Sequence, residues 1–184
     1  YIYWPYALSG VGLFRFVVWL FALVLLAAMF LYDLRWTILP DKLTRSLLAL
    51  AAIQLIVLST IREVSVHEIA ATTLSVLVGG GVFHLIYEIS NGKYIGGGDV
   101  KLGYAYGLLL MDPLMSWMVL AIASLIGSMV AISLIILKKK TLQSKLPFGP
   151  MLILGLFIVM LFGQNIWTHL NTLMLYSVSY THLR

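Results

Sequence analysis

Long apolar segments separated by short polar ones make up most of this chain. The apolar runs cover 13–32, 46–61, 68–89, 100–111, 114–137 and 150–167. A helix needs about 20 apolar residues to cross a bilayer, and in lipid only a helix or a closed barrel satisfies its own main-chain groups. The pattern therefore predicts an all-α integral membrane protein with about six transmembrane helices. We expect a single domain over 1–184, with its core at 13–167 and a polar tail at 168–184.

Two of the predicted helices contain irregular features. The run at 100–111 is about half the length of a span and follows the polar, glycine-rich segment 90–99, so it predicts a short or broken helix. Non-helical main chain at membrane depth is tolerated only against protein or a water-filled cavity, which makes 90–99 a candidate site. In the third run, Gly79, Gly80 and Gly81 are expected to let a neighbouring helix approach closely or to let the helix bend.

Composition excludes several kinds of chemistry. The 184 residues are 61% hydrophobic and only 10% charged, which agrees with lipid as the main solvent. Cysteine is absent, so disulfides, thiolate nucleophiles and Cys-ligated zinc are excluded. The four His show neither HxxxH nor HxxH spacing, and we expect no metal site.

The net charge of +5 is best explained by membrane topology. With six spans, the loops after the first, third and fifth helices share one side of the membrane. They contain Arg35, Lys42, Arg45, Lys93, Lys101, Lys138, Lys139, Lys140 and Lys145. The other side has only Arg15, Arg62 and Arg184. The positive-inside rule then places the basic loops in the cytoplasm, and no nucleic-acid partner is expected.

Two aspartates stand out at this predicted cytoplasmic end. Asp33 ends the first apolar run, and Asp99 follows Gly96, Gly97 and Gly98. Two carboxylates close together in a poorly solvated site cannot both ionise, so one can act as a base while the other holds a proton, as in aspartic proteases. The glycines would let the main chain approach a substrate strand and adopt dihedrals closed to other residues. In the alternative reading, both aspartates mark the aqueous ends of helices, with Asp99 as an N-cap.

Three motifs resemble those of a known family and follow one another in the same order. Gly96 to Asp99 matches the GxGD signature of membrane aspartic proteases, and Val100-Lys101-Leu102 extends it to the GxGDVKL form of the type IV prepilin peptidases. The segment from Asp33 to Leu39-Pro40-Asp41 resembles the other aspartate motif of that family. Leu146-Pro147-Phe148-Gly149-Pro150 resembles its late PFGP element. The resemblance covers about 29–162.

The resemblance implies a catalytic pair, Asp33 and Asp99, in an endopeptidase that removes the basic leader of type IV prepilin-like precursors, in pilus assembly or type II secretion. Cleavage would take place at the cytoplasmic face of a bacterial inner membrane and would need no cofactor. The supporting or substrate-binding residues would be Gly96, Gly97, Gly98, Lys101, Pro40, Asp41, Pro147, Phe148 and Gly149. From the residues alone, Asp41 also fits a helix cap or a structural hydrogen bond. Lys101 also fits an interfacial lysine, a group that tunes Asp99, or a partner for a substrate carboxylate.

The chain departs from typical bacterial members of the family. They resemble it but carry an additional N-terminal region with four cysteines and an N-methyltransferase activity that uses S-adenosylmethionine. The chain contains no cysteine. Either it is a fragment of a longer enzyme or it is a minimal peptidase. The sequence does not decide between cleavage alone and cleavage followed by methylation.

Two other functions compete with this reading. A presenilin-like or signal-peptide-peptidase-like protease would share Tyr32-Asp33 and GxGD, but it would carry a PAL motif where the chain has Leu146-Pro147-Phe148. A small transporter would use Asp33 and Asp99 to bind a cation or proton at a broken helix. It would place the carboxylates near the bilayer midplane and would show an inverted internal repeat, and the sequence has neither feature.

Overall fold

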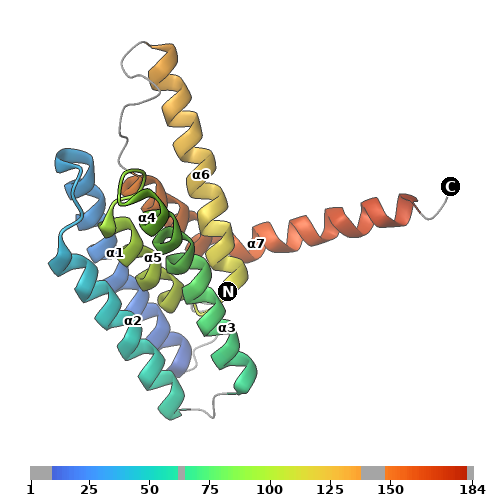
Figure 1. Ribbon diagram of the computed structural model, residues 1–184. Helices are drawn as coiled ribbons and strands as arrows, with labels where there is room; N and C mark the ends of the chain where they lie inside the picture. The colour runs from blue at the N-terminus through green and yellow to red at the C-terminus, as the bar shows by residue number, and fades with distance from the viewer. Residues whose placement is uncertain (1–9, 62–64, 138–147, 182–184) are drawn as a thin grey trace.

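A computed structural model describes residues 10–61, 65–137 and 148–181. The helices are α1 (Gly10–Trp36), α2 (Asp41–Ile61), α3 (Val66–Val76), η1 (Leu77–Gly81), α4 (Val82–Ser90), α5 (Gly97–Leu110), α6 (Pro113–Ile136) and α7 (Gly149–Thr181) (Figure 1). The described ranges contain helices and no strand. The predicted all-α fold class is confirmed.

Within the described residues, four stretches are long and apolar enough to cross a membrane. They are α1, α2, α6 and the continuous stretch Val66–Ser90 that joins α3, η1 and α4. Gly149–Gly163 in α7 is a shorter apolar helix. With 14 residues, α5 is about 21 Å long against a hydrocarbon core of about 30 Å, which matches the short helix predicted from the fourth apolar run.

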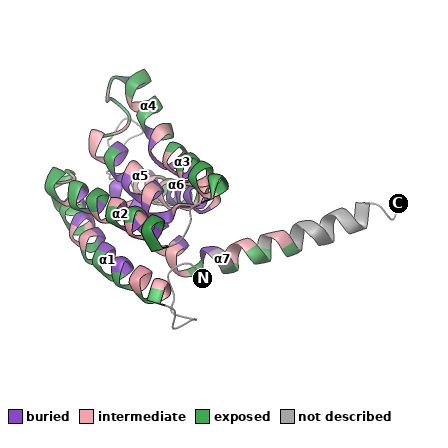
Figure 2. Ribbon diagram, turned by 90° about the horizontal axis from the view of Figure 1, so that it is seen from below, coloured by how far each residue is buried: buried purple, intermediate pink, exposed green. Residues whose placement is uncertain are grey.

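The short helix α5 lies at the centre of the bundle. It contacts α2, α3, η1, α4, α6 and α7. Leu102, Ala105, Tyr106 and Leu109 on α5 are completely buried. Figure 2 shows the same organisation, since buried residues face the interior and the outward faces of the surrounding helices are exposed, as expected for surfaces in contact with lipid. The neighbouring helices therefore fix the position of α5.

Glycines allow α5 to pack directly on the helix formed by α3, η1 and α4. A Cβ on Gly79 would lie 2.7 Å from the carbonyl oxygen of Gly103, and a Cβ on Gly107 would lie 2.7 Å from the carbonyl oxygen of Ser75. The main chains thus touch where larger residues would separate them. The predicted close approach of a neighbouring helix is confirmed at Gly79 and Gly80, whereas a Cβ on Gly81 would meet only Leu77 of its own helix. The three glycines lie in a π-helical turn, η1.

Neutral polar side chains are buried along the same contact. The Ser75 hydroxyl donates to the carbonyl oxygen of Gly107 at 2.7 Å and lies 2.8 Å from the hydroxyl of Ser116 on α6. The Gln54 amide on α2 donates to the carbonyl oxygen of Leu109 at 3.0 Å. These bonds tie α5 to α2 and α3, and α3 to α6, toward the end of α5 that is opposite to Asp99.

The last helix is longer than the sequence predicted. We expected it to end near Trp167 and to be followed by a polar tail, but α7 continues to Thr181. Beyond the bundle it projects away from the other helices (Figure 1). Main-chain hydrogen bonds within a helix are independent of side-chain polarity, so the loss of apolar character after Trp167 did not mark the end of the helix.

Candidate active site

Asp33 lies in the last turn of α1 and is buried, with 4% of its surface exposed. The helix ends just beyond it. The main-chain N–H of Thr37 donates to the carbonyl oxygen of Asp33 at 2.9 Å, and Thr37 has a left-handed conformation with φ 53°. This turn reverses the chain into the connection 37–40, which leads to α2.

Asp99 is the third residue of α5 and has 8% of its surface exposed. The N-cap of α5 is Gly96, whose main chain is extended, and the N–H of Asp99 donates to the carbonyl oxygen of Gly96 at 3.0 Å. The expectation that Asp99 is itself the N-cap is therefore wrong. Helix formation starts three residues earlier than expected, because Gly97 and Gly98 adopt the first turn of α5 instead of a loop.

The glycines before Asp99 also differ from the expectation. Among the described residues, the glycine with positive φ is Gly92, so Gly96, Gly97 and Gly98 do not use dihedrals closed to other residues. Their small size matters instead at one position: a Cβ on Gly98 would lie 2.8 Å from Cβ of Leu39. Gly98 thus lets the connection 37–40 pack against the start of α5.

The N-terminus of α7 brings the two aspartates into one site. A Cβ on Gly149 would overlap Oδ2 of Asp33 and would lie 3.2 Å from Oδ1 of Asp99. Because both oxygens lie so close to one point, the two carboxylates are near neighbours, and Gly149 forms the wall beside them. The structure therefore brings together Asp33, Asp99 and Gly149, which come from three separate motifs.

Asp41 and Lys101 lie beside this site and contact each other. The Lys101 ammonium donates to Oδ1 of Asp41, and Arg45 lies 3.5 Å from Oδ2 of Asp41. The structural hydrogen bond considered for Asp41 is present, with Lys101 as its donor. Pro40 contributes through its carbonyl oxygen, which accepts from the hydroxyl of buried Thr44 at 3.1 Å.

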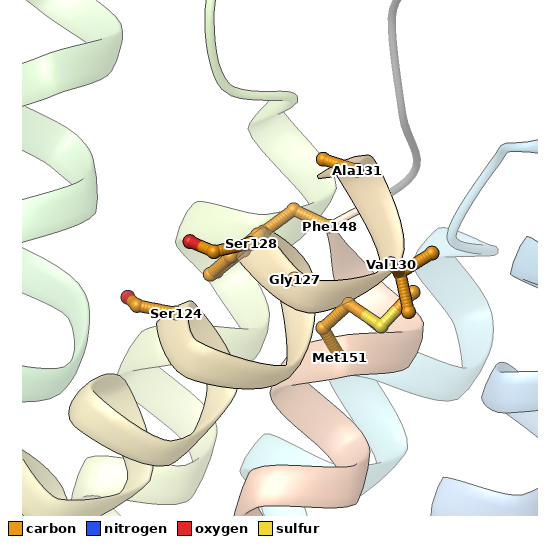
Figure 3. Close-up of a pocket in the computed structure, with 7 residues that line it drawn as sticks. All are labelled: Ser124, Gly127, Ser128, Val130, Ala131, Phe148 and Met151. Atoms are coloured by element: carbon orange, nitrogen blue, oxygen red, sulfur yellow. The ribbon is translucent and has the colours of Figure 1, made fainter. Parts of the chain in front are cut away.

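Phe148, the residue before Gly149, lines a cavity. The cavity has a volume of about 340 Å³. Its walls come from α6 and the beginning of α7 (Figure 3), and its residues are Ser124, Gly127, Ser128, Val130, Ala131, Phe148 and Met151. The Phe148 ring also packs edge-on against Phe83, with ring centroids 5.7 Å apart. Pro147 lies outside the described residues.

The residues of α6 in this cavity were not predicted from the sequence. They have a recognisable signal, since Ser124, Ser128 and Ala131 recur at helical spacing and leave one face of α6 with small side chains. Within a run as apolar as 114–137, that signal is weak, and without the position of Phe148 it does not indicate a site.

The arrangement suits acid–base chemistry on a polarised bond. When two buried carboxyl groups lie close together, the pair carries a single negative charge more readily than two negative charges. One carboxylate can then accept a proton while the other carboxyl group donates one.

Within the described residues, no group of three or more His, Asp or Glu side chains could hold a metal ion. Nδ1 of His84 in α4 lies 3.1 Å from the Tyr104 hydroxyl on α5, so this histidine forms a hydrogen bond between two helices.

Comparison with known proteins identifies the family. The model of the type IV leader peptidase family matches residues 19–132, which include Asp33 and Asp99. A prepilin leader peptidase/N-methyltransferase from Legionella pneumophila is 29% identical over 154 residues. The alignment covers 80% of the chain and 50% of that relative, so the chain spans about half the length of the relative it matches. No solved structure matches. Since the family model covers more than half of the sequence, the chain belongs to the type IV leader peptidase family.

Proposed function

We propose that the protein is an aspartic endopeptidase that removes the basic leader from type IV prepilin-like precursors. The observation that carries the proposal is the meeting of two buried carboxylates, Asp33 and Asp99, beside Gly149. Membership of the leader peptidase family supports the reaction class. Similarity to the prepilin leader peptidase/N-methyltransferase of Legionella pneumophila supports prepilin as the kind of substrate.

In the proposed reaction, the carboxylate pair holds one proton. The ionised aspartate removes a proton from a water molecule, and the resulting hydroxide attacks the carbonyl carbon of the scissile peptide bond. The protonated aspartate donates its proton to the carbonyl oxygen. The tetrahedral intermediate then collapses as the C–N bond breaks: one of its hydroxyl groups returns a proton to the aspartate that had protonated the carbonyl oxygen, and the leaving amine takes up the proton that came from water. Both aspartates return to their starting state, and this sequence of steps uses no cofactor.

The cavity beside Phe148 is suited to the apolar part of a precursor. Its walls contain no charged side chain, and it lies on α6 directly beside the N-terminus of α7. We propose that the apolar helix of the precursor packs along this side of α6. Its leader then reaches the carboxylates next to Gly149, and its basic residues are attracted by the net negative charge of the pair.

The proposed location is the inner membrane of a bacterium, with the site at the cytoplasmic end of the bundle. The end of α1, the start of α2, the start of α5 and the start of α7 lie at one end of the bundle, toward the top of Figure 1. The helices α1, α4 and α6, which precede the predicted basic loops in the sequence, also end at this end of the bundle. The positive-inside rule supports a cytoplasmic assignment for it.

Replacement of each aspartate by asparagine tests the proposal. In the full chain, in detergent or liposomes, Asp33→Asn and Asp99→Asn are each expected to slow leader removal by about 10²- to 10⁴-fold, because each removes a proton-transfer group. Gel shift and the mass of the product measure cleavage. Glu88→Gln is the matched control, since Glu88 is an exposed carboxylate on α4 that pairs with His84. Activity retained in either aspartate variant would overturn the two-aspartate mechanism.

The same assay addresses methyl transfer. Incubation with labelled S-adenosylmethionine, with cleavage as the internal control, tests whether the new amino terminus becomes methylated. Cleavage without label transfer would limit the activity of this chain to the peptidase reaction. Label on the cleaved product would show that the chain also carries out the second activity named for its relative.

A further inference from the structure

An ion pair links the two segments of the chain that carry the aspartates. Lys101 on α5 donates to Oδ1 of Asp41, the first residue of α2. Their side chains are about half exposed, at 52% for Lys101 and 50% for Asp41. Arg45 also approaches Asp41, at 3.5 Å, but it belongs to the same helix and links no second element.

The position of this ion pair relative to the site is specific. Lys101 is two residues after Asp99 in α5. Asp41 is the first residue after the connection 37–40, which begins where α1, the helix that contains Asp33, ends. One apolar contact accompanies it, since Leu39 lies against Gly98, where a Cβ would be 2.8 Å from Cβ of Leu39. The connection 37–40 is therefore fastened to the start of α5 at two adjacent points, one apolar and one ionic.

Stability does not explain the ion pair. Half-exposed ion pairs contribute little to the free energy of unfolding, because water screens the charges and ordering two long side chains costs entropy. Catalytic geometry is far more sensitive, since a displacement of about 1 Å can slow a reaction about 10²-fold. A contact that adds little to the free energy of unfolding can still determine how far apart two catalytic carboxylates lie.

We propose that Asp41 and Lys101 are positioning residues whose ion pair holds the connection 37–40 against α5 and so sets the spacing of Asp33 and Asp99. This inference rests on the proposed function, because it assigns the pair a role in the same site. It differs from a direct role of Lys101 on Asp99 or on a substrate carboxylate, in which Asp41 would have no part.

Kinetics of the full chain separate these roles. Asp41→Asn and Lys101→Gln are each expected to lower kcat about tenfold with KM unchanged, because positioning affects the reaction more than binding. The combined variant is expected to be no slower than either single variant, since both remove the same contact. Lys101→Arg keeps the charge and should recover most of the rate. Arg45→Gln is the matched control and should leave kcat unchanged.

Three kinetic results would overturn the inference. A raised KM in Lys101→Gln alone would indicate that Lys101 binds the substrate. Effects that multiply in the combined variant would indicate independent roles for Asp41 and Lys101. Parental rates in both single variants, with cleavage by the parent intact, would remove the positioning role while the proposed function stands.

A second measurement does not depend on activity. The chain contains no cysteine, so Asp33→Cys combined with Asp99→Cys provides a single possible disulfide whose rate of formation reports how closely the two positions approach. Adding Lys101→Gln or Asp41→Asn is expected to slow this oxidation severalfold, and adding Arg45→Gln to leave it unchanged. An unchanged rate with Lys101→Gln would overturn the inference. If the parent chain cleaves no precursor, the proposed function fails, and these rates still decide the role of the ion pair.

Discussion

Gly103 and Gly149 both lie where a larger side chain would not fit, but for different reasons. At Gly103, the space is taken by the carbonyl oxygen of Gly79 and by the ring of Phe83, so two helices touch main chain to main chain. At Gly149, the space is taken by the carboxylates of Asp33 and Asp99. The first contact holds α5 in the bundle, and the second keeps room for charged groups. One residue type therefore supports packing in one region and the candidate chemistry in the other.

The polar groups near the two contacts show the same contrast. On the packing side, the hydroxyls of Ser75 and Ser116 bond to each other and Ser75 bonds to the carbonyl oxygen of Gly107, so neutral donors and acceptors are matched. On the other side, two carboxylates face each other, which is unfavourable when both are ionised. Groups that conflict with stability are typical of functional sites. The following substitutions separate the two regions, from the largest expected effect to the smallest.

Gly149→Ala should affect activity most. The new methyl group overlaps Oδ2 of Asp33 and pushes the carboxylates apart, so leader removal is expected to slow about 10²-fold. Thermal unfolding in detergent should change less than the cleavage rate, because the atom that is displaced is the end of the Asp33 side chain and not main chain. Gly81→Ala is the control, since its Cβ would have 3.7 Å to the nearest atom. Normal cleavage by Gly149→Ala would contradict the placement of Gly149 against the pair.

Gly103→Ala should show the opposite pattern. A Cβ there would lie 2.9 Å from the ring of Phe83 and still closer to the carbonyl oxygen of Gly79, so α5 and η1 must separate. We expect a loss of about 1–3 kcal/mol in unfolding free energy, typical of overpacking. The fraction that stays folded at low temperature should retain most of its cleavage rate. Loss of activity without loss of stability would remove the contrast between the regions.

Ser116→Ala should have the smallest effect. It removes one partner of Ser75, whose hydroxyl still donates to the carbonyl oxygen of Gly107. The expected loss is about 1 kcal/mol, the net value of one buried hydrogen bond, with cleavage unchanged. Thermal unfolding compared with Ser133→Ala, whose exposed hydroxyl bonds only within α6, isolates the buried contact. Equal unfolding temperatures for the two variants would show that the buried bond adds nothing.

Much of the architecture could be predicted, because apolar length is a strong signal in a membrane protein. The short run before Met111 predicted a short α5, and Gly79–Gly81 predicted a close helix contact, since each depends on local composition. The start of α5 was misplaced, because glycine gives no sign of whether it opens a loop or the first turn of a helix. The end of α7 was misplaced as well, since polarity marks the membrane border and not the end of a helix.

The candidate site could be predicted only in part. Motif order and charge distribution placed Asp33 and Asp99 at one end of the bundle, where the structure brings them together. The ion pair of Asp41 and Lys101 could not be predicted, because it joins residues 60 positions apart and many exposed charges offer equivalent partners. Nor could the cavity on α6, since its walls depend on where the chain returns at Phe148.

The shortness of α5 has a consequence for how the protein is made. The long helices α1, α2 and α6 and the stretch Val66–Ser90 are each apolar enough to be inserted into the bilayer one at a time during synthesis. With 14 residues, α5 is too short to be retained there alone and depends on the helices around it. Asp99 is thus carried by a segment that is held in place only by its neighbours, and Gly149 reaches it only after α7 has been synthesised. A nascent chain at the translocon would accordingly have no assembled aspartate pair until the bundle is complete.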